Sequence, residues 1–111
     1  MITIVELPEF IRRAKKLLSE TERERLIHYL AAHSDSGVLI EGTGGIRKIR
    51  WKREGMGKSG GVRVIYYYHN EQYPVFLLTV FGKSEQSNVS RAERNELAQL
   101  VRLLLEQYRN V

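Results

Sequence analysis

The sequence predicts an α+β fold in which an N-terminal strand and a helical hairpin precede a mainly antiparallel, twisted sheet of about four to five strands and a C-terminal helix. Apolar residues recur at helical spacing near both ends of the chain, and runs of β-branched and aromatic residues separated by turn signals fill the middle. The 111 residues suffice for one modest core, so we expect a single domain spanning residues 1–111.

A short strand around Ile4 opens the chain, and Pro8 suits the first turn of a helix, because a proline there loses no intrahelical hydrogen bond. The residues expected to face the core from this helix are Phe10, Ile11, Ala14, Leu17 and Leu18. The outer face carries four cations, Arg12, Arg13, Lys15 and Lys16. A basic helix face of this kind is more often solvated than functional.

Ser19 and Thr21 are each followed three residues later by a glutamate, so both are candidates to open a second helix through a capping box. The inward-facing residues of this helix, antiparallel to the first, are Leu26, Ile27 and Leu30. Residues 35–37 interrupt the helical pattern, and residues 38–40 form a short apolar run suited to an edge strand.

Two strands, at residues 46–52 and 62–68, follow from alternation at period two and from β-branched and aromatic content. The connection 54–61 contains four glycines without apolar periodicity, which predicts a long, mobile hairpin loop. Residues 75–81 are almost continuously apolar, so we expect a strand buried on both faces at the centre of the sheet. Ser90 begins a further capping box, and the inward stripe of the final helix is Leu97, Leu100, Val101, Leu104 and Tyr108.

Nearly all the unbalanced charge lies between residues 47 and 63. This segment holds one carboxylate, Glu54, and seven cations: Arg47, Lys48, Arg50, Lys52, Arg53, Lys58 and Arg63. Positive and negative charges nearly cancel in the rest of the chain, so the net charge of +5 comes from this one region. Clustered bases indicate a polyanionic partner, and nucleic acid is the commonest.

Strand alternation sorts these cations and the neighbouring tyrosines by face. Lys48, Arg50 and Lys52 share one side of the first central strand. Arg63 and Tyr67 share one side of the second, whereas the tyrosines on either side of Tyr67 are expected in the core. An aromatic ring beside an arginine can stack on a base, so RNA contact and core packing are both open for Tyr67.

Other chemistries find no support in the sequence. Without cysteine there is no disulfide or thiolate zinc site, and the three histidines lack metal-ligand spacing, so we expect no metal and no cofactor. Residues 55–60 match GxGxxG and residues 57–59 match the end of a P-loop, but a strand follows where both motifs need a helix. The first ten residues carry acids where a signal peptide has bases, and no run of about 20 apolar residues is present, so we expect a cytoplasmic protein without a signal peptide or a membrane partner.

Three stretches, GTGGIRKIRW, GGVRVIYYY and VFLLTVFGKSE, resemble the RelE/ParE superfamily of bacterial toxins, specifically its HigB-like branch. The resemblance covers most of the chain and implies the RelE-like fold. It also implies a toxin of a type II toxin-antitoxin system, whose partner is a cognate antitoxin, expected to be a helix-turn-helix protein. RelE-like and HigB-like members cut messenger RNA on the ribosome, whereas ParE-like members poison DNA gyrase.

Matched position by position, the resemblance assigns catalytic roles to four residues: Lys48, Arg50, Arg63 and Lys83. Four further residues are expected to bind the substrate: Arg47, Lys52, Lys58 and Tyr67. The chain departs from the RelE-like pattern at Ser84 and about Ser90, where such enzymes carry an arginine and a tyrosine. The group that activates the nucleophile and the group that protonates the leaving oxygen are therefore both open, with Tyr67 and His69 as alternatives.

The residue types suit metal-free cleavage, in which the ribose 2′-OH attacks the adjacent phosphate and the 5′-oxygen leaves. Arginine binds phosphate bidentately and stays charged, which suits Arg50 and Arg63 to the phosphorane. A lysine among other cations loses its proton more readily, which suits Lys48 as the general base, and Lys83 would hold transition-state charge. Two alternatives remain: a gyrase inhibitor without nuclease chemistry, and a plain RNA-binding module.

Overall fold

The computed structural model describes residues 2–53, 60–86 and 88–109. In this part of the chain the elements are β1 (Ile4–Glu6), α1 (Pro8–Leu17), α2 (Glu20–Ala32), β2 (Val38–Leu39), β3 (Ile46–Trp51), β4 (Val62–Tyr67), β5 (Val75–Gly82) and α3 (Arg91–Arg109). The order confirms the predicted α+β fold class. Most of the predicted glycine-rich connection lies outside the described residues.

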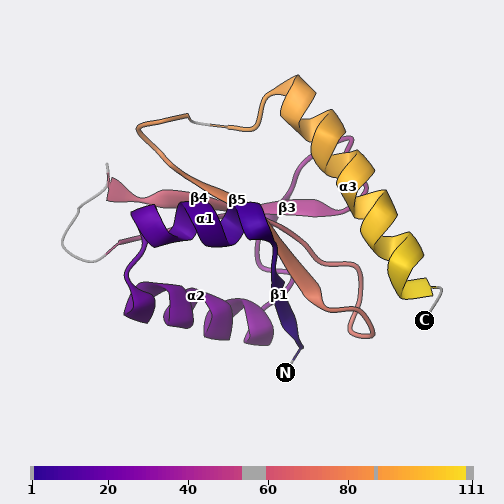
Figure 1. Ribbon diagram of the computed structural model, residues 1–111, viewed down its shortest axis with the longest axis horizontal. Helices are drawn as coiled ribbons and strands as arrows, with labels where there is room; N and C mark the ends of the chain where they lie inside the picture. The colour runs from indigo at the N-terminus through magenta and orange to yellow at the C-terminus, as the bar shows by residue number, and fades with distance from the viewer. Residues whose placement is uncertain (1, 54–59, 87, 110–111) are drawn as a thin grey trace.

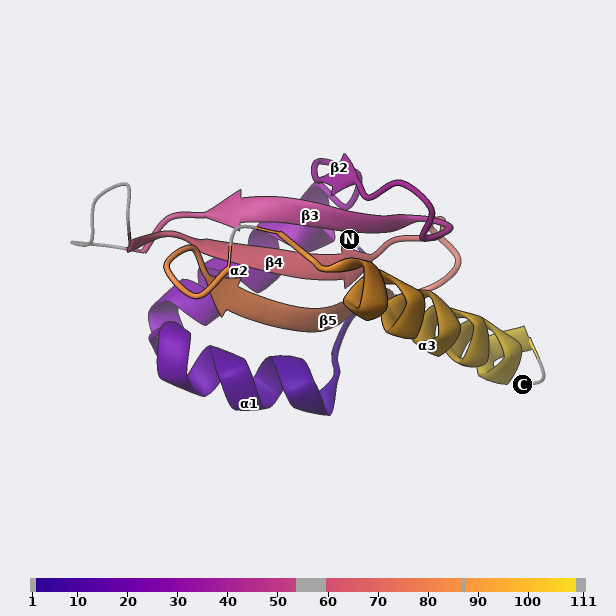
Figure 2. The same ribbon diagram turned by 90° about the horizontal axis from the view of Figure 1, so that it is seen from above.

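Five strands among the described residues form one mixed sheet in the order β1-β5-β4-β3-β2. The pairs from β2 to β5 are antiparallel, as the opposed arrows of β3, β4 and β5 show (Figure 2). β1 joins β5 in parallel. β5 is buried along its whole length, as predicted. The expectation that β5 forms the centre of the sheet is wrong. In the observed order β4 is the middle strand, and β5 lies between β4 and the edge strand β1.

Alternate residues of β4 build the cores on the two faces of the sheet. Val62, Val64 and Tyr66 pack against α1 and α2 on one side. Ile65 and Tyr67 pack against α3 on the other, so the helical hairpin and the C-terminal helix enclose the sheet between them (Figure 1). A strand with both faces buried explains why residues 62–67 carry so little polar surface.

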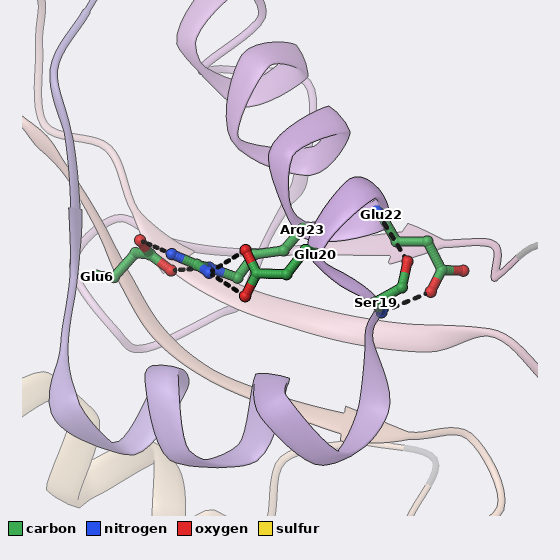
Figure 3. A network of polar contacts seen from close by, with 5 residues as sticks. All are labelled: Glu6, Ser19, Glu20, Glu22 and Arg23. Atoms are coloured by element: carbon green, nitrogen blue, oxygen red, sulfur yellow. Dashed lines mark hydrogen bonds and ion pairs between the residues drawn. The ribbon is translucent and has the colours of Figure 1, made fainter.

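The helices begin at the caps that the sequence predicts. Pro8 occupies the first turn of α1. Ser19, rather than Thr21, opens α2: its hydroxyl accepts a hydrogen bond from the Glu22 backbone N–H at 3.1 Å, and the Glu22 carboxylate accepts one from the Ser19 N–H at 2.8 Å (Figure 3). This reciprocal pair satisfies two N–H groups that lack helical partners.

Two predicted core positions are wrong. Ile11 is 37% exposed, because it lies one residue, or about 100°, around α1 from the buried stripe of Phe10 and Ala14. Tyr108 is 42% exposed, near the end of α3, where its ring meets Phe76 edge-on with centroids 5.5 Å apart. The buried stripe of α1 is therefore narrower than the sequence pattern predicts, and that of α3 ends before Tyr108.

An ion pair fastens α2 to β1 (Figure 3). Arg23 donates from Nε to Glu6 Oε2 at 2.7 Å and from Nη2 to Glu6 Oε1 at 3.1 Å, and its Nη1 lies 3.4 Å from Glu20. The hydrogen bonds to Glu6 raise the pKa of Arg23 above its ordinary value, although burial opposes the shift. This contact holds the helical hairpin against the edge of the sheet that β1 forms, opposite the edge formed by β2.

Candidate functional site

The register between β3 and β4 brings three of the predicted cations together. Arg50 lies directly opposite Arg63, and Lys48 lies opposite Ile65, two residues along. Residues that oppose each other across antiparallel strands project to the same face of the sheet. Lys48, Arg50 and Arg63 therefore share the face on which α3 packs, and we call these three residues the cationic cluster.

Arg63 is buried, with 7% of its surface exposed. Within the described part of the chain, its side chain has neither a carboxylate partner nor a hydrogen bond. Burial, and secondarily the like charge of Arg50, lower the pKa of Arg63 below its ordinary value. An unpaired buried charge is costly, and such groups concentrate at functional sites. The Arg63 guanidinium is therefore suited to receive an anionic ligand.

Lys83 reaches the same end of the sheet from β5. That strand ends at Gly82, one position beyond the residue opposite Arg63. The Lys83 backbone N–H donates to the Gly61 carbonyl at 3.1 Å, and its side chain is exposed. Glu85 fixes the turn, because its carboxylate accepts a hydrogen bond from the Gly82 N–H at 3.1 Å. Lys83 thus lies at the border of the cationic cluster.

Lys48 has a partner that the sequence does not indicate. Its Nζ donates to Asn88 Oδ1 at 3.2 Å. The same oxygen accepts a hydrogen bond from the Val89 N–H at 2.9 Å, and Val89 is itself part of the core under α3. Asn88 is thereby oriented by its own backbone toward the lysine. A lone asparagine in a polar segment carries no sequence signal for a contact that spans 40 positions.

The segment that carries Asn88 is tied to the start of α3. Ser90 opens this helix as predicted: its hydroxyl accepts from the Glu93 N–H at 3.1 Å, and Glu93 accepts from the Ser90 N–H at 2.9 Å. These hydrogen bonds lower the pKa of Glu93 below its ordinary value of 4.5, although burial opposes the shift. Gln86 donates to the Asn88 carbonyl at 2.9 Å, which further restrains the segment.

A family model described as the RelE toxin of the RelE/RelB toxin-antitoxin system matches residues 8–110. The chain belongs to the RelE toxin family. Membership confirms the resemblance to the RelE/ParE superfamily, makes the chain the toxin of a toxin-antitoxin system, and implies an antitoxin as its partner.

Among solved structures, this RelE-family chain is similar to a mutant of the E. coli toxin RelE in the free state. The TM-score is 0.56 at 20% sequence identity, and the match covers 78% of this chain and 87% of that chain. At this identity the likeness shows the fold alone. It agrees with the RelE-like arrangement expected from the sequence.

Arg47, one of the predicted substrate-binding residues of this RelE-family toxin, lies on the other face of the sheet from the cationic cluster. Its Nη1 donates to the carbonyls of Asp35 and Gly37, both at 2.9 Å. Its guanidinium also lies 5.9 Å from the ring centroid of Tyr68. Successive residues of β3 face opposite sides of the sheet, so Arg47 points away from Lys48. Its two hydrogen bonds restrain the segment before β2.

Tyr67 shares the face of Arg63, as parity predicts, but its side chain is only 1% exposed. The ring packs in the core under α3, and the hydroxyl lies 3.0 Å from Nδ1 of His69. Of its two open roles, the structure therefore favours core packing. Lys52 follows the end of β3 and is exposed, whereas Lys58 lies outside the described residues.

The concavities differ in charge. A groove of about 570 Å³ runs beside β3 and is lined by Lys48 and Arg50 among others. A cleft of about 600 Å³ lies elsewhere, and its described lining residues include Asp35 and Glu71 but no lysine or arginine. The second cleft does not suit a phosphate. Within the described residues, no group of acidic and histidine side chains suits a metal ion, and no helix there is both long and apolar enough to cross a membrane.

Proposed function

We propose that this toxin is a ribosome-dependent endoribonuclease, an mRNA interferase, that inhibits translation by cutting messenger RNA. One observation carries the proposal: the buried Arg63 lies opposite Arg50 and beside Lys48, and no described carboxylate forms an ion pair with any of them. A desolvated guanidinium next to a like charge is costly unless an anion binds there. The scissile phosphate of RNA is such an anion.

The proposed reaction needs no metal ion. Lys48, in its neutral form, removes the proton of the ribose 2′-OH, and the 2′-oxygen attacks the adjacent phosphate. Arg50 and Arg63 bind the phosphorane oxygens, on which negative charge accumulates. Lys83, at the border of the cationic cluster, stabilises the charge that develops as the 5′-oxygen leaves.

The ribosome is expected to complete the site. Arg50 and Lys83 are exposed, so this side of the cationic cluster is open to solvent. Such an open site excludes little water and does not by itself hold a flexible strand in line for attack. We therefore propose that the RNA is positioned by the decoding ribosome, in the cytoplasm, and that free RNA is a poor substrate.

Expression of the toxin without its antitoxin tests the proposal. We expect growth arrest accompanied by new 5′ ends within translated regions, detected by primer extension. Intact transcripts in arrested cells, together with a fall in DNA supercoiling, would overturn the nuclease and favour the gyrase inhibitor.

Substitution of Arg63 tests the observation that carries the proposal. Arg63→Ala is expected to abolish cleavage. Arg63→Lys keeps the charge but loses the bidentate fork, so we expect cleavage to fall about a hundredfold or more. Circular dichroism checks that both variants fold, and Arg12→Lys on α1 is the control. Undiminished RNA binding and toxicity in Arg63→Lys would favour the plain RNA-binding module, for which point charge suffices.

The HigB-like branch and a helix-turn-helix antitoxin remain predictions from the resemblance. A neighbouring gene that encodes a small helix-turn-helix protein would support both.

A further inference from the structure

We propose that the groove along the outer edge of β3 is an RNA subsite in which a nucleobase that flanks the cleaved bond stacks on Tyr29 and Trp51. The inference rests on the proposed RNA-cleaving function and extends it to residues outside the cationic cluster.

The groove exists because β2 is shorter than β3. β2 pairs only with Arg47 and Lys48, so in the described part of the chain no strand covers the outer edge of β3 from Ile49 to Trp51. The groove of about 570 Å³ lies along this uncovered edge, between β3 and α2. Four successive residues of β3, Lys48 to Trp51, line the groove. Successive residues face opposite sides of a sheet, so the groove runs along the edge of the strand rather than over one face.

Two aromatic side chains line the groove. Tyr29 of α2 and Trp51 of β3 have ring centroids 5.5 Å apart, with their planes inclined at 51°. The His33 ring also lies close to Tyr29, with centroids 4.7 Å apart. Tyr29 remains 37% exposed, so part of its ring is free to contact a ligand. Exposed aromatic rings are the usual platforms for unpaired bases.

The charge of the groove decides which ligand it suits. Lys48 and Arg50 line it together with the aromatic residues, and among the described residues its lining contains no aspartate or glutamate. The same two cations belong to the cationic cluster, so the groove and the proposed cleavage site are continuous across the edge of β3. A strand of RNA crossing this edge would keep its phosphates on cations while a base reaches the rings. Aromatic platforms beside a cationic path are the general features of single-stranded nucleic-acid sites.

A protein segment is the competing occupant. Val38 and Leu39 of β2 are 69% and 57% exposed, and an extended peptide can pair with an open strand edge. RNA is favoured because the groove joins the cationic cluster directly. The experiment below tests both RNA and a peptide as occupants of the groove.

Trp51 is the only tryptophan of the chain, so its fluorescence reports on this groove alone. The probe is a short single-stranded RNA carrying 2′-O-methyl groups, which lacks the 2′-OH nucleophile and is not cut. The control ligand is an abasic strand of the same length and charge. We expect the strand with bases to quench Trp51 and the abasic strand to leave its emission nearly unchanged.

Matched variants locate the contact. Tyr29→Leu is expected to weaken binding of the base-containing strand about fivefold to a hundredfold, and to leave binding of the abasic strand unchanged. Trp51→Leu, followed by anisotropy of a labelled strand, should show a similar loss. The control is Tyr108→Leu on α3, a tyrosine of similar exposure that does not line the groove, and it should bind as wild type.

Equal quenching by both strands, or wild-type affinity in Tyr29→Leu, would overturn the subsite. So would an acidic peptide from the antitoxin that quenches Trp51 when the base-containing strand does not, and that result would assign the groove to a protein segment. Because the probe is not cut, quenching is measured without cleavage. An active nuclease without quenching would refute the subsite alone, and quenching without cleavage in cells would refute only the nuclease.

Discussion

Asn88 is the residue whose contact adds most to the candidate site. Its side-chain oxygen accepts a hydrogen bond from the Lys48 ammonium at 3.2 Å and a second one from the Val89 N–H, which holds the oxygen in place. A neutral acceptor orients a lysine without stabilising its protonated form as strongly as a carboxylate would. Asparagine is therefore suited to position a lysine that must give up a proton before it can act as a base.

Asn88→Ala tests this role. The variant should lower kcat for cleavage, because it removes the contact that orients the Lys48 ammonium. Asn88→Gln keeps the amide but displaces its oxygen, so we expect it to lower kcat as well. Ribosome-programmed cleavage measures both variants. A wild-type kcat in Asn88→Ala would show that Asn88 does not position Lys48.

The helix caps show how single residues set the limits of an element. Ser90 and Glu93 exchange two hydrogen bonds at the start of α3, close to the segment that carries Asn88. The pKa of Glu93 is depressed below 4.5, so its stabilising effect is complete above about that pH. The effect is lost as the pH falls through the lower, folded-state pKa.

Glu93→Ala is expected to reduce the free energy of unfolding by about 1 kcal/mol at pH 7, as other cap losses do. The difference from wild type should shrink as the pH falls below 4.5, because the carboxylate then protonates in the wild-type protein as well. Urea unfolding at pH 7 and under acid conditions measures this difference. Glu96→Ala, exposed on the same helix, is the control, and a pH-independent loss in Glu93→Ala would contradict the assignment.

Two ion pairs of the helical hairpin differ in burial, so they show how burial changes the contribution of an ion pair to stability. Arg23 and Glu6 join α2 to β1 with side chains 31% and 18% exposed. Arg12 and Glu9 lie 3.8 Å apart on α1 with side chains 64% and 50% exposed. Arg23→Ala should cost about 2 kcal/mol of unfolding free energy, because it leaves the partly buried Glu6 carboxylate without its partner.

Arg12→Ala should cost less than about 0.5 kcal/mol, as expected of an exposed pair. Thermal or urea unfolding of the two variants under the same conditions makes the comparison. Equal losses would mean that the Arg23 contact contributes no more than a surface pair.

The distribution of charge over the whole molecule bears on how the antitoxin binds. One basic surface is the cationic cluster with Lys52, and another is the exposed face of α1, which includes Arg12 and Lys16. Arg13 of the same helix is partly buried, and its Nη1 lies 4.0 Å from Glu85. The more exposed cations of α1 are thus available to a partner without disturbing the turn after β5.

We expect the antitoxin to bind the α1 surface and to block access to the ribosome by bulk. Reversal of charge at Arg12 and Lys16 should then weaken the complex strongly, with a slower and less salt-sensitive association. Reversal at Arg50 and Lys52 should leave it nearly intact. Association rates measured at several salt concentrations test this. The opposite pattern would place the antitoxin over β3 and the cationic cluster.

Local patterns were sufficient for most elements. The proline of α1, the capping boxes of α2 and α3 and the period-two alternation of β3 and β4 act within a few residues, so each is visible in a short window of sequence. The same patterns placed Lys48 and Arg50 on one face and Arg63 and Tyr67 on one face. The helical pattern wrongly placed Ile11 in the core. Periodicity alone does not show how much of a helix surface is buried by the element packed against it.

The amino-acid order alone determines which residues are helical or extended, which side of its own strand each cation occupies, and where the positive charge is concentrated. The register that sets Arg50 against Arg63, the burial of Arg63 and the Lys48 contact with Asn88 arise only when distant segments pair. So do the parallel addition of β1 beside β5 and the short β2 that leaves the edge of β3 open. These features depend on how separate segments share one core, and the free energy of that packing is not contained in any single segment.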